Sequence, residues 1–135
     1  MATMLPDAIE RERETMLHDT MDVLKSRGFG RFDVHDLPGF SEPRELTIPV
    51  LNVHLRPDIL ATDDQGHTVL AMVEPSTDLG EDSCGRRWQM IENWAQGHNA
   101  ELHVFVHPED ENRAAAIARA WHLSDDIIET LPRTH

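Results

Sequence analysis

The chain has 135 residues, 39% of them hydrophobic, which is enough to build one domain with a proper core over residues 1–135. No apolar run approaches the roughly 18 residues that a membrane-spanning helix needs, so we expect no membrane partner. The 25 acidic residues outnumber the 12 basic ones, and the formal net charge of −13 disfavours nucleic acid as a partner without excluding it, because the phosphate backbone is a polyanion.

A helical pattern opens the chain, from residue 5 to about residue 27. Apolar side chains recur there at three-, four- and seven-residue spacing, a Pro-Asp pair stands near the start, and Gly28 follows the end. Residues 28–32 predict a turn into a short strand or loop. The prolines and the glycine of residues 37–43 predict an irregular loop.

Three strands are expected next. The first covers residues 45–55, where apolar residues alternate and Pro49 indicates a bulge or a sheet edge. The second and third cover residues 57–62 and 67–74. Because the turn sequence Asp-Asp-Gln-Gly separates them, we expect these two strands to pair as a β-hairpin.

A second helix follows a polar connection at residues 78–83. We expect Asp82 or Ser83 to cap it, because both side chains accept hydrogen bonds from free backbone amides at a helix start. The helix runs to about Gly97 and carries one apolar stripe. The residues of this stripe are Cys84, Trp88, Ile91 and Ala95, with Trp94 beside it.

The C-terminal part predicts a strand, a helix and a short strand. Leu102, Val104 and Val106 alternate with His103 and Phe105. Because the second face carries Phe105 as well, residues 102–106 are typical of a central parallel strand buried on both sides. Residues 109 to about 122 form an amphipathic helix, and residues 126–131 form a short closing strand. The side chains expected to face inward from this helix are Ala116, Ile117, Ala120 and Trp121. The order α-β-β-β-α-β-α-β predicts an α/β fold with a mixed central sheet flanked by helices.

The cysteine content and the first residues bear on location. Cys84 is the single cysteine and cannot form an internal disulfide, which is compatible with a reducing cytosol. The first residues lack a basic region followed by an apolar stretch, so we expect no secretory signal and a cytoplasmic protein.

Two carboxylates stand at adjoining ends of the predicted hairpin. Asp58 opens its first strand and Glu74 closes its second, so pairing about the turn sets the two acids close together. Neighbouring carboxylates can bind a hard divalent cation such as Mg²⁺ or Mn²⁺ through their oxygens. No phosphate-binding glycine loop is present, and we expect no organic cofactor.

Pro57-Asp58 and Glu74-Pro75-Ser76 resemble the two-part motif of the PD-(D/E)XK superfamily of restriction-endonuclease-like nucleases. The resemblance implies the αβββαβ core of that fold, extended here by a C-terminal helix and a short strand, as one endonuclease-like domain. It implies that Asp58, Glu74 and the Pro75 carbonyl bind Mg²⁺ or Mn²⁺. Ser76 then takes the position of the lysine that positions or activates the attacking water.

The same resemblance implies further site residues on the two helices. In many relatives a glutamate of the first helix reaches the metal, which points to Glu10 or Glu14; the alternative is that both are simply exposed. Relatives often carry a basic or amide group facing the phosphate on the helix after the second acid. Arg86, Arg87 and Gln89 are available there, and the arginines could instead form surface ion pairs with neighbouring acids.

Two functions are compatible with these observations. One is a metal-dependent nuclease acting on DNA phosphodiester bonds. The other, which we favour because the motif lysine is missing, is an endonuclease-like fold that has lost catalysis and serves as a binding or assembly module. The second function includes a homodimer, formed through the tryptophan-bearing helices or an exposed strand edge. Whether the protein is an enzyme is left undecided by the sequence.

Overall fold

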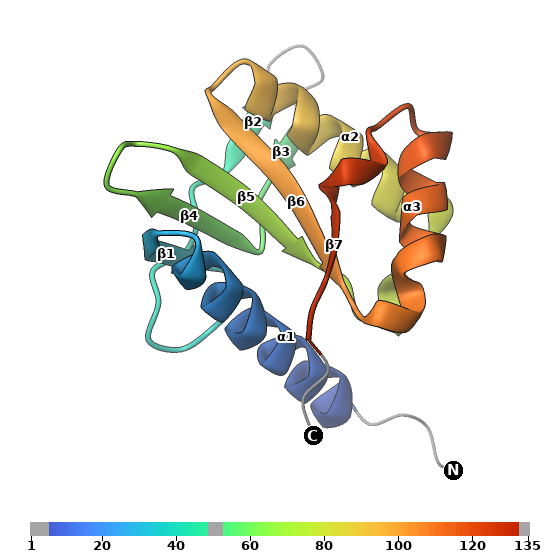
Figure 1. Ribbon diagram of the computed structural model, residues 1–135, viewed down its shortest axis with the longest axis horizontal. Helices are drawn as coiled ribbons and strands as arrows, with labels where there is room; N and C mark the ends of the chain where they lie inside the picture. The colour runs from blue at the N-terminus through green and yellow to red at the C-terminus, as the bar shows by residue number, and fades with distance from the viewer. Residues whose placement is uncertain (1–5, 49–52, 133–135) are drawn as a thin grey trace.

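The computed structural model describes residues 6–48 and 53–132, and within them it shows a mixed α/β arrangement (Figure 1). The main sheet has five strands in the order β1-β4-β5-β6-β7. Neighbours are antiparallel from β1 to β5 and parallel from β5 to β7. The strands are β1 (Phe29–Val34), β4 (Ile59–Asp63), β5 (Thr68–Val73), β6 (Ala100–Val106) and β7 (Ile128–Thr130).

Helices cover both faces of this sheet. Helix α1 (Pro6–Ser26) crosses one face, while α2 (Glu81–Gln96) and α3 (Glu111–Ala120) lie on the other (Figure 1). Side chains alternate along each strand, so β5 and β6 contribute to a core on each face. The prediction that residues 102–106 form a parallel strand buried on both sides is confirmed.

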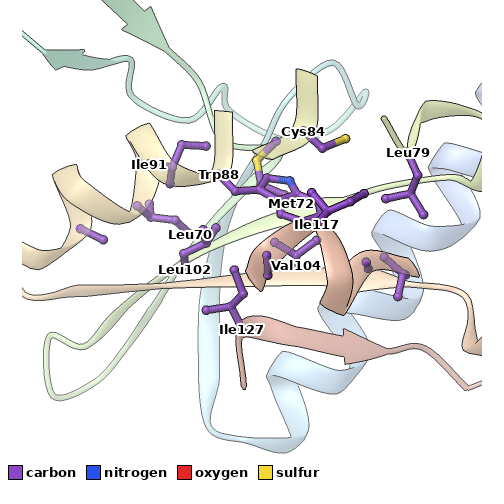
Figure 2. Close-up of a cluster of buried hydrophobic side chains, with 14 of the residues drawn as sticks. Leu70, Met72, Leu79, Cys84, Trp88, Ile91, Leu102, Val104, Ile117 and Ile127 are labelled. Carbon is purple, nitrogen blue, oxygen red and sulfur yellow. The ribbon is translucent and has the colours of Figure 1, made fainter. Parts of the chain in front are cut away.

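The two cores differ in their largest members. On the α2 and α3 side, Trp88 of α2 is fully buried and packs toward Met72 of β5 and Val104 of β6 (Figure 2). On the α1 side, Leu17 and Phe105 are both fully buried. Because each fully buried side chain of this size contributes roughly 1.5–3 kcal/mol, both helical layers are firmly attached to the sheet.

Most predicted elements have the expected bounds. The first helix, the hairpin β4–β5, the second helix, the irregular loop and the closing strand all occur within a few residues of their predicted positions. Apolar periodicity identified the helices, and the turn residues, prolines and glycine identified the hairpin and the irregular loop.

The prediction of one strand over residues 45–55 is wrong. The region contains two short strands, β2 (Leu46–Ile48) and β3 (Val53–Leu55), which pair antiparallel in a separate two-stranded sheet. Residues 49–52, including Pro49, lie outside the described residues. The apolar pattern has another explanation, since Leu46 is fully buried in the core under α2. The first strand of the main sheet is instead β1, an edge strand whose apolar residues are interrupted by Gly30, Arg31 and Asp33.

Two finer predictions about the helices are also wrong. Gly80 is the N-cap of α2, and Asp82 and Ser83 lie inside the helix without capping it through a side chain. In α3, Ala116 and Ala120 are exposed, whereas Ala114, Ile117 and Ala118 are buried. Alanine occupies half of the positions of this helix and lies on several of its sides, so hydrophobicity alone does not identify its inner face.

None of the helices that the structure describes combines the length and the apolar character needed to cross a bilayer.

Candidate functional site

The two motif acids lie side by side at one end of the main sheet. Asp58 directly precedes β4 and Glu74 directly follows β5, and these strands pair with Ile59 opposite Ala71. The Asp58 Oδ2 atom accepts a hydrogen bond of 2.9 Å from the backbone amide of Val73. The predicted hairpin therefore brings both carboxylates to one place.

Both acids belong to the side of the sheet that α2 covers. Leu60 of β4 and Met72 of β5 pack in the core under α2. Asp58 lies two residues before Leu60, and Glu74 lies two residues after Met72. Since side chains alternate with a period of two, the carboxylates extend from the same face of the sheet.

The acids line an open cavity of about 610 Å³. Its walls come from α1, from the loop after β1, from the segment before β4 and from α2. Glu10 and Glu14, the first-helix acids singled out from the sequence, both line it. The other lining residues are Arg13, His35, Asp36, Pro38, Arg56, Asp58, Met72, Val73, Glu74, Asp78 and Arg87.

Asp58 is paired with an arginine of the first helix. The Arg13 Nη2 atom donates to Asp58 Oδ1 at 2.9 Å and also to the carbonyl of His35 at 3.3 Å. The Asp58 side chain is only 14% exposed. Both of its carboxylate oxygens therefore have donors from the protein itself.

Glu74 is paired with the second helix and is almost completely buried, at 2% exposure. Its Oε2 atom accepts hydrogen bonds from Arg87 Nη2 at 2.8 Å and from Trp88 Nε1 at 2.9 Å. Burial raises the pKa of Glu74, and the negative charge of Asp58 acts in the same direction; Arg87 and Trp88 oppose both effects. The two acids are thus close enough to affect each other electrostatically.

The other two positions of the Glu74-Pro75-Ser76 tripeptide lie outside the cavity lining. The Ser76 hydroxyl donates to Oδ2 of Asp110, the residue at the N-cap position of α3. The carbonyl of Pro75 accepts a hydrogen bond of 2.8 Å from the amide of Asp78 and closes a short 3₁₀ turn. Neither Pro75 nor Ser76 is among the lining residues.

The three polar candidates on α2 have separate surroundings. Arg87 reaches the cavity, whereas Arg86 is exposed and does not line it. The Gln89 amide donates to the carbonyl of Trp121 at 2.7 Å and joins α2 to α3. The structure therefore brings together Asp58, Glu74 and Arg87, and leaves Gln89 apart from them.

Sequence reasoning missed Arg13. The residue belongs to the charged run of residues 10–14, and such a run is usually a solvated helix face. It follows Glu10 by three positions and directly precedes Glu14, so all three share one side of α1 and line the cavity together. This shared helix face is the sequence signal that could have placed Arg13 beside Glu10 and Glu14 in the candidate site.

A divalent cation would have to compete with the partners that the two acids already have. Such an ion prefers about six oxygen ligands, whereas the described part of the chain holds no group of three His, Cys, Asp or Glu residues placed to bind a metal. The Asp58 and Glu74 carboxylates are bound by arginines instead.

Comparisons with protein-family models, with curated proteins and with solved structures give no match. The interpretation of the site therefore rests on its own geometry.

Proposed function

We propose that this chain is an endonuclease-like-fold module, derived from PD-(D/E)XK nucleases, that binds or assembles with another molecule and does not cleave DNA. The order α1-β1-β4-β5-α2-β6 supports the fold part of the proposal, because it repeats the helix and strand order of the αβββαβ core. The positions of Asp58 and Glu74 at adjoining strand ends support the motif assignment. The cavity beside them is the proposed binding site.

The observation that best supports the proposed loss of catalysis is that the Ser76 side chain is hydrogen-bonded to Asp110. In the motif that the chain resembles, the third position holds a lysine that acts on the attacking water. Here the Ser76 hydroxyl donates to Asp110 and the residue does not line the cavity. The position therefore serves the start of α3 and supplies no group to the two acids.

One observation favours the alternative, a Mg²⁺- or Mn²⁺-dependent nuclease. Arg87 places a permanent positive charge 2.8 Å from Glu74 within the cavity, and Glu10 and Glu14 add two carboxylates nearby. In this alternative Asp58 and Glu74 would hold the metal, which supplies a nucleophilic hydroxide and stabilises charge. Arg87 would then bind the phosphate.

A cleavage assay distinguishes the two functions. Purified protein with Mn²⁺ is incubated with single- and double-stranded DNA, from low to molar salt, because screening removes the effect of the net charge of −13. We expect no cleavage beyond that of Asp58→Asn. The matched control is Asp64→Asn in the exposed hairpin turn. Cleavage that Asp58→Asn abolishes and Asp64→Asn preserves would establish the nuclease instead.

A homodimer is the simplest assembly included in this proposal. The tryptophans offer little surface for it, because Trp88 is fully buried, Trp94 stacks on His98 at 3.8 Å, and Trp121 packs against Gly85. The outer edges of β1 and β7, the first and last strands of the main sheet, are the other route that the sequence suggested. Light scattering of the purified protein measures whether a dimer forms.

A further inference from the structure

Two arginines from opposite layers of the fold meet at the acids. Arg13 comes from α1 and Arg87 from α2, and these helices cover different faces of the sheet (Figure 1). Arg13 binds Asp58 and Arg87 binds Glu74. Each motif carboxylate therefore has its own guanidinium, delivered by a different helix.

The charges of this arrangement balance. Two carboxylates carry two negative charges, and two guanidinium groups supply the two positive charges that one divalent cation would otherwise supply. Arginine cannot lose its proton in proteins, so the two positive charges persist at every physiological pH. A divalent cation would have to displace the arginines or approach two fixed positive charges in a partly buried cavity, where the repulsion is stronger than in water.

We propose that Arg13 and Arg87 are built-in counter-ions that exclude divalent cations from the acid pair. The inference deepens the proposed non-catalytic function, on which it rests, by assigning the exclusion of metal to two specific residues. It implies that the acids keep the capacity to bind a cation once an arginine is removed. Glu10 and Glu14 line the same cavity and form no ion pair with a described residue. Their carboxylate oxygens are therefore further ligands for a cation in the opened site.

The first test removes the charge of Arg87. Binding of Mn²⁺ is followed by the loss of the paramagnetic resonance signal of the free ion, and thermal unfolding is followed with and without millimolar Mn²⁺. We expect no specific binding by the wild type. We expect Arg87→Gln to bind one Mn²⁺ and to unfold about 5 °C higher with Mn²⁺ than without it. Arg86→Gln, which removes the neighbouring exposed arginine, should behave as the wild type.

Two further variants keep the test decisive where Arg87→Gln folds poorly, because it leaves Glu74 buried without its partner. Arg13→Gln removes the other counter-ion, and Asp58 keeps its hydrogen bond from the Val73 amide. This variant should also gain one Mn²⁺, and Arg11→Gln on the same helix is its control. The double variant Arg87→Gln/Glu74→Gln removes both charges and should fold without binding Mn²⁺.

The outcomes separate this inference from the proposed function. Specific Mn²⁺ binding by the wild type, abolished by Asp58→Asn, would overturn the inference even if no DNA is cleaved. Failure of both Arg13→Gln and Arg87→Gln to gain Mn²⁺ would also overturn it, since the arginines would then not be what keeps the metal out. DNA cleavage dependent on Asp58 would overturn the proposed function itself.

Discussion

Ser76 is held in a structural role, away from the acids. Its hydroxyl donates to Asp110, whose side chain is only 7% exposed at the start of α3. A hydrogen bond to a charged, nearly buried group contributes about 1.5–3 kcal/mol, so the position is tied to the stability of the third helix. The motif residue therefore has a use that does not involve the cavity.

Introducing the lysine of the motif should consequently fail to create a nuclease. We expect Ser76→Lys to show no DNA cleavage with Mn²⁺, because the new side chain starts from a position directed at Asp110 and replaces a hydrogen bond that α3 needs. We also expect a loss of about 1–2 kcal/mol in unfolding free energy, measured in urea. Ser83→Lys, at an exposed site on α2, is the control and should be close to neutral. DNA cleavage by Ser76→Lys would show that a side chain at position 76 can still reach Asp58 and Glu74.

The acid pair was predictable from the sequence and its counter-ions were not. Asp58 and Glu74 belong to a local hairpin, whose register follows from its turn and its apolar pattern. Arg13 lies 45 positions before Asp58 and meets it only after α1 has packed on the sheet. Contacts of this kind depend on tertiary placement, which neither spacing nor periodicity encodes.

At the scale of the elements, helix α2 approaches the end of helix α3 closely at Gly85. A Cβ atom added to this glycine would lie 1.9 Å from Cδ1 of Trp121. Glycine therefore occurs inside a helix, where it costs about 1 kcal/mol relative to alanine, because the indole ring occupies the space next to its backbone. The helix pair depends on this close approach.

We expect Gly85→Ala to destabilise the protein by up to about 2 kcal/mol. Overpacking costs roughly 1–3 kcal/mol, and the gain in helix propensity offsets about 1 kcal/mol of this. Urea denaturation measures the difference. The control is Gly97→Ala at the end of the same helix, where an added Cβ atom meets a neighbour at an ordinary 3.7 Å. A stabilised Gly85→Ala protein would mean that Trp121 moves aside freely.

The edge strand β1, whose region the sequence predicted only as a short strand or loop, shows where patterns mislead. β1 contains glycine, arginine and aspartate because it is an edge strand with exposed positions, so it lacks a clear apolar alternation. Residues 45–55 have that alternation, yet β2 and β3 form a separate sheet, and Leu46 of β2 is buried in the core under α2. An apolar pattern indicates that a segment is buried. It does not distinguish a strand that is buried against a helix from a strand that belongs to the main sheet.

At the scale of the whole molecule, Glu129 in the last strand contacts both the residue that follows the first helix and the neighbouring strand β6. It lies in β7, 2.6 Å from Nδ1 of His103 in β6, and it accepts hydrogen bonds from Arg27, just beyond α1. Burial alone would raise the pKa of Glu129, but the close contact with the His103 imidazole and the hydrogen bonds from Arg27 outweigh it and lower this pKa to about 2. The side chain is 18% exposed.

The depressed pKa of Glu129 predicts a loss of stability in acid. Its contribution is fully present above the ordinary pKa of 4.5 and disappears as the pH falls towards 2, because protonation then favours the unfolded chain. After a discount for solvent screening we expect about 2 kcal/mol. The measurement is urea denaturation of the wild type and Glu129→Gln between pH 6 and pH 2.5.

The difference in unfolding free energy between these two proteins should shrink over that interval. Glu101→Gln, which changes a highly exposed residue of β6, should show no such convergence with the wild type. A constant difference between the wild type and Glu129→Gln at all pH values would mean that the carboxylate does not titrate as described.

The pairing of Arg13 with Asp58 also links ligand binding to the motion of a helix. Any cationic molecule that takes the Asp58 carboxylate must release Arg13, and with it a contact that holds α1 against the end of the sheet near His35. Occupancy of the cavity and detachment of this end of α1 are then coupled equilibria, and the coupling is equal in both directions. A partner that pressed α1 onto the sheet would weaken the binding of such a ligand, and one that pulled α1 away would strengthen it.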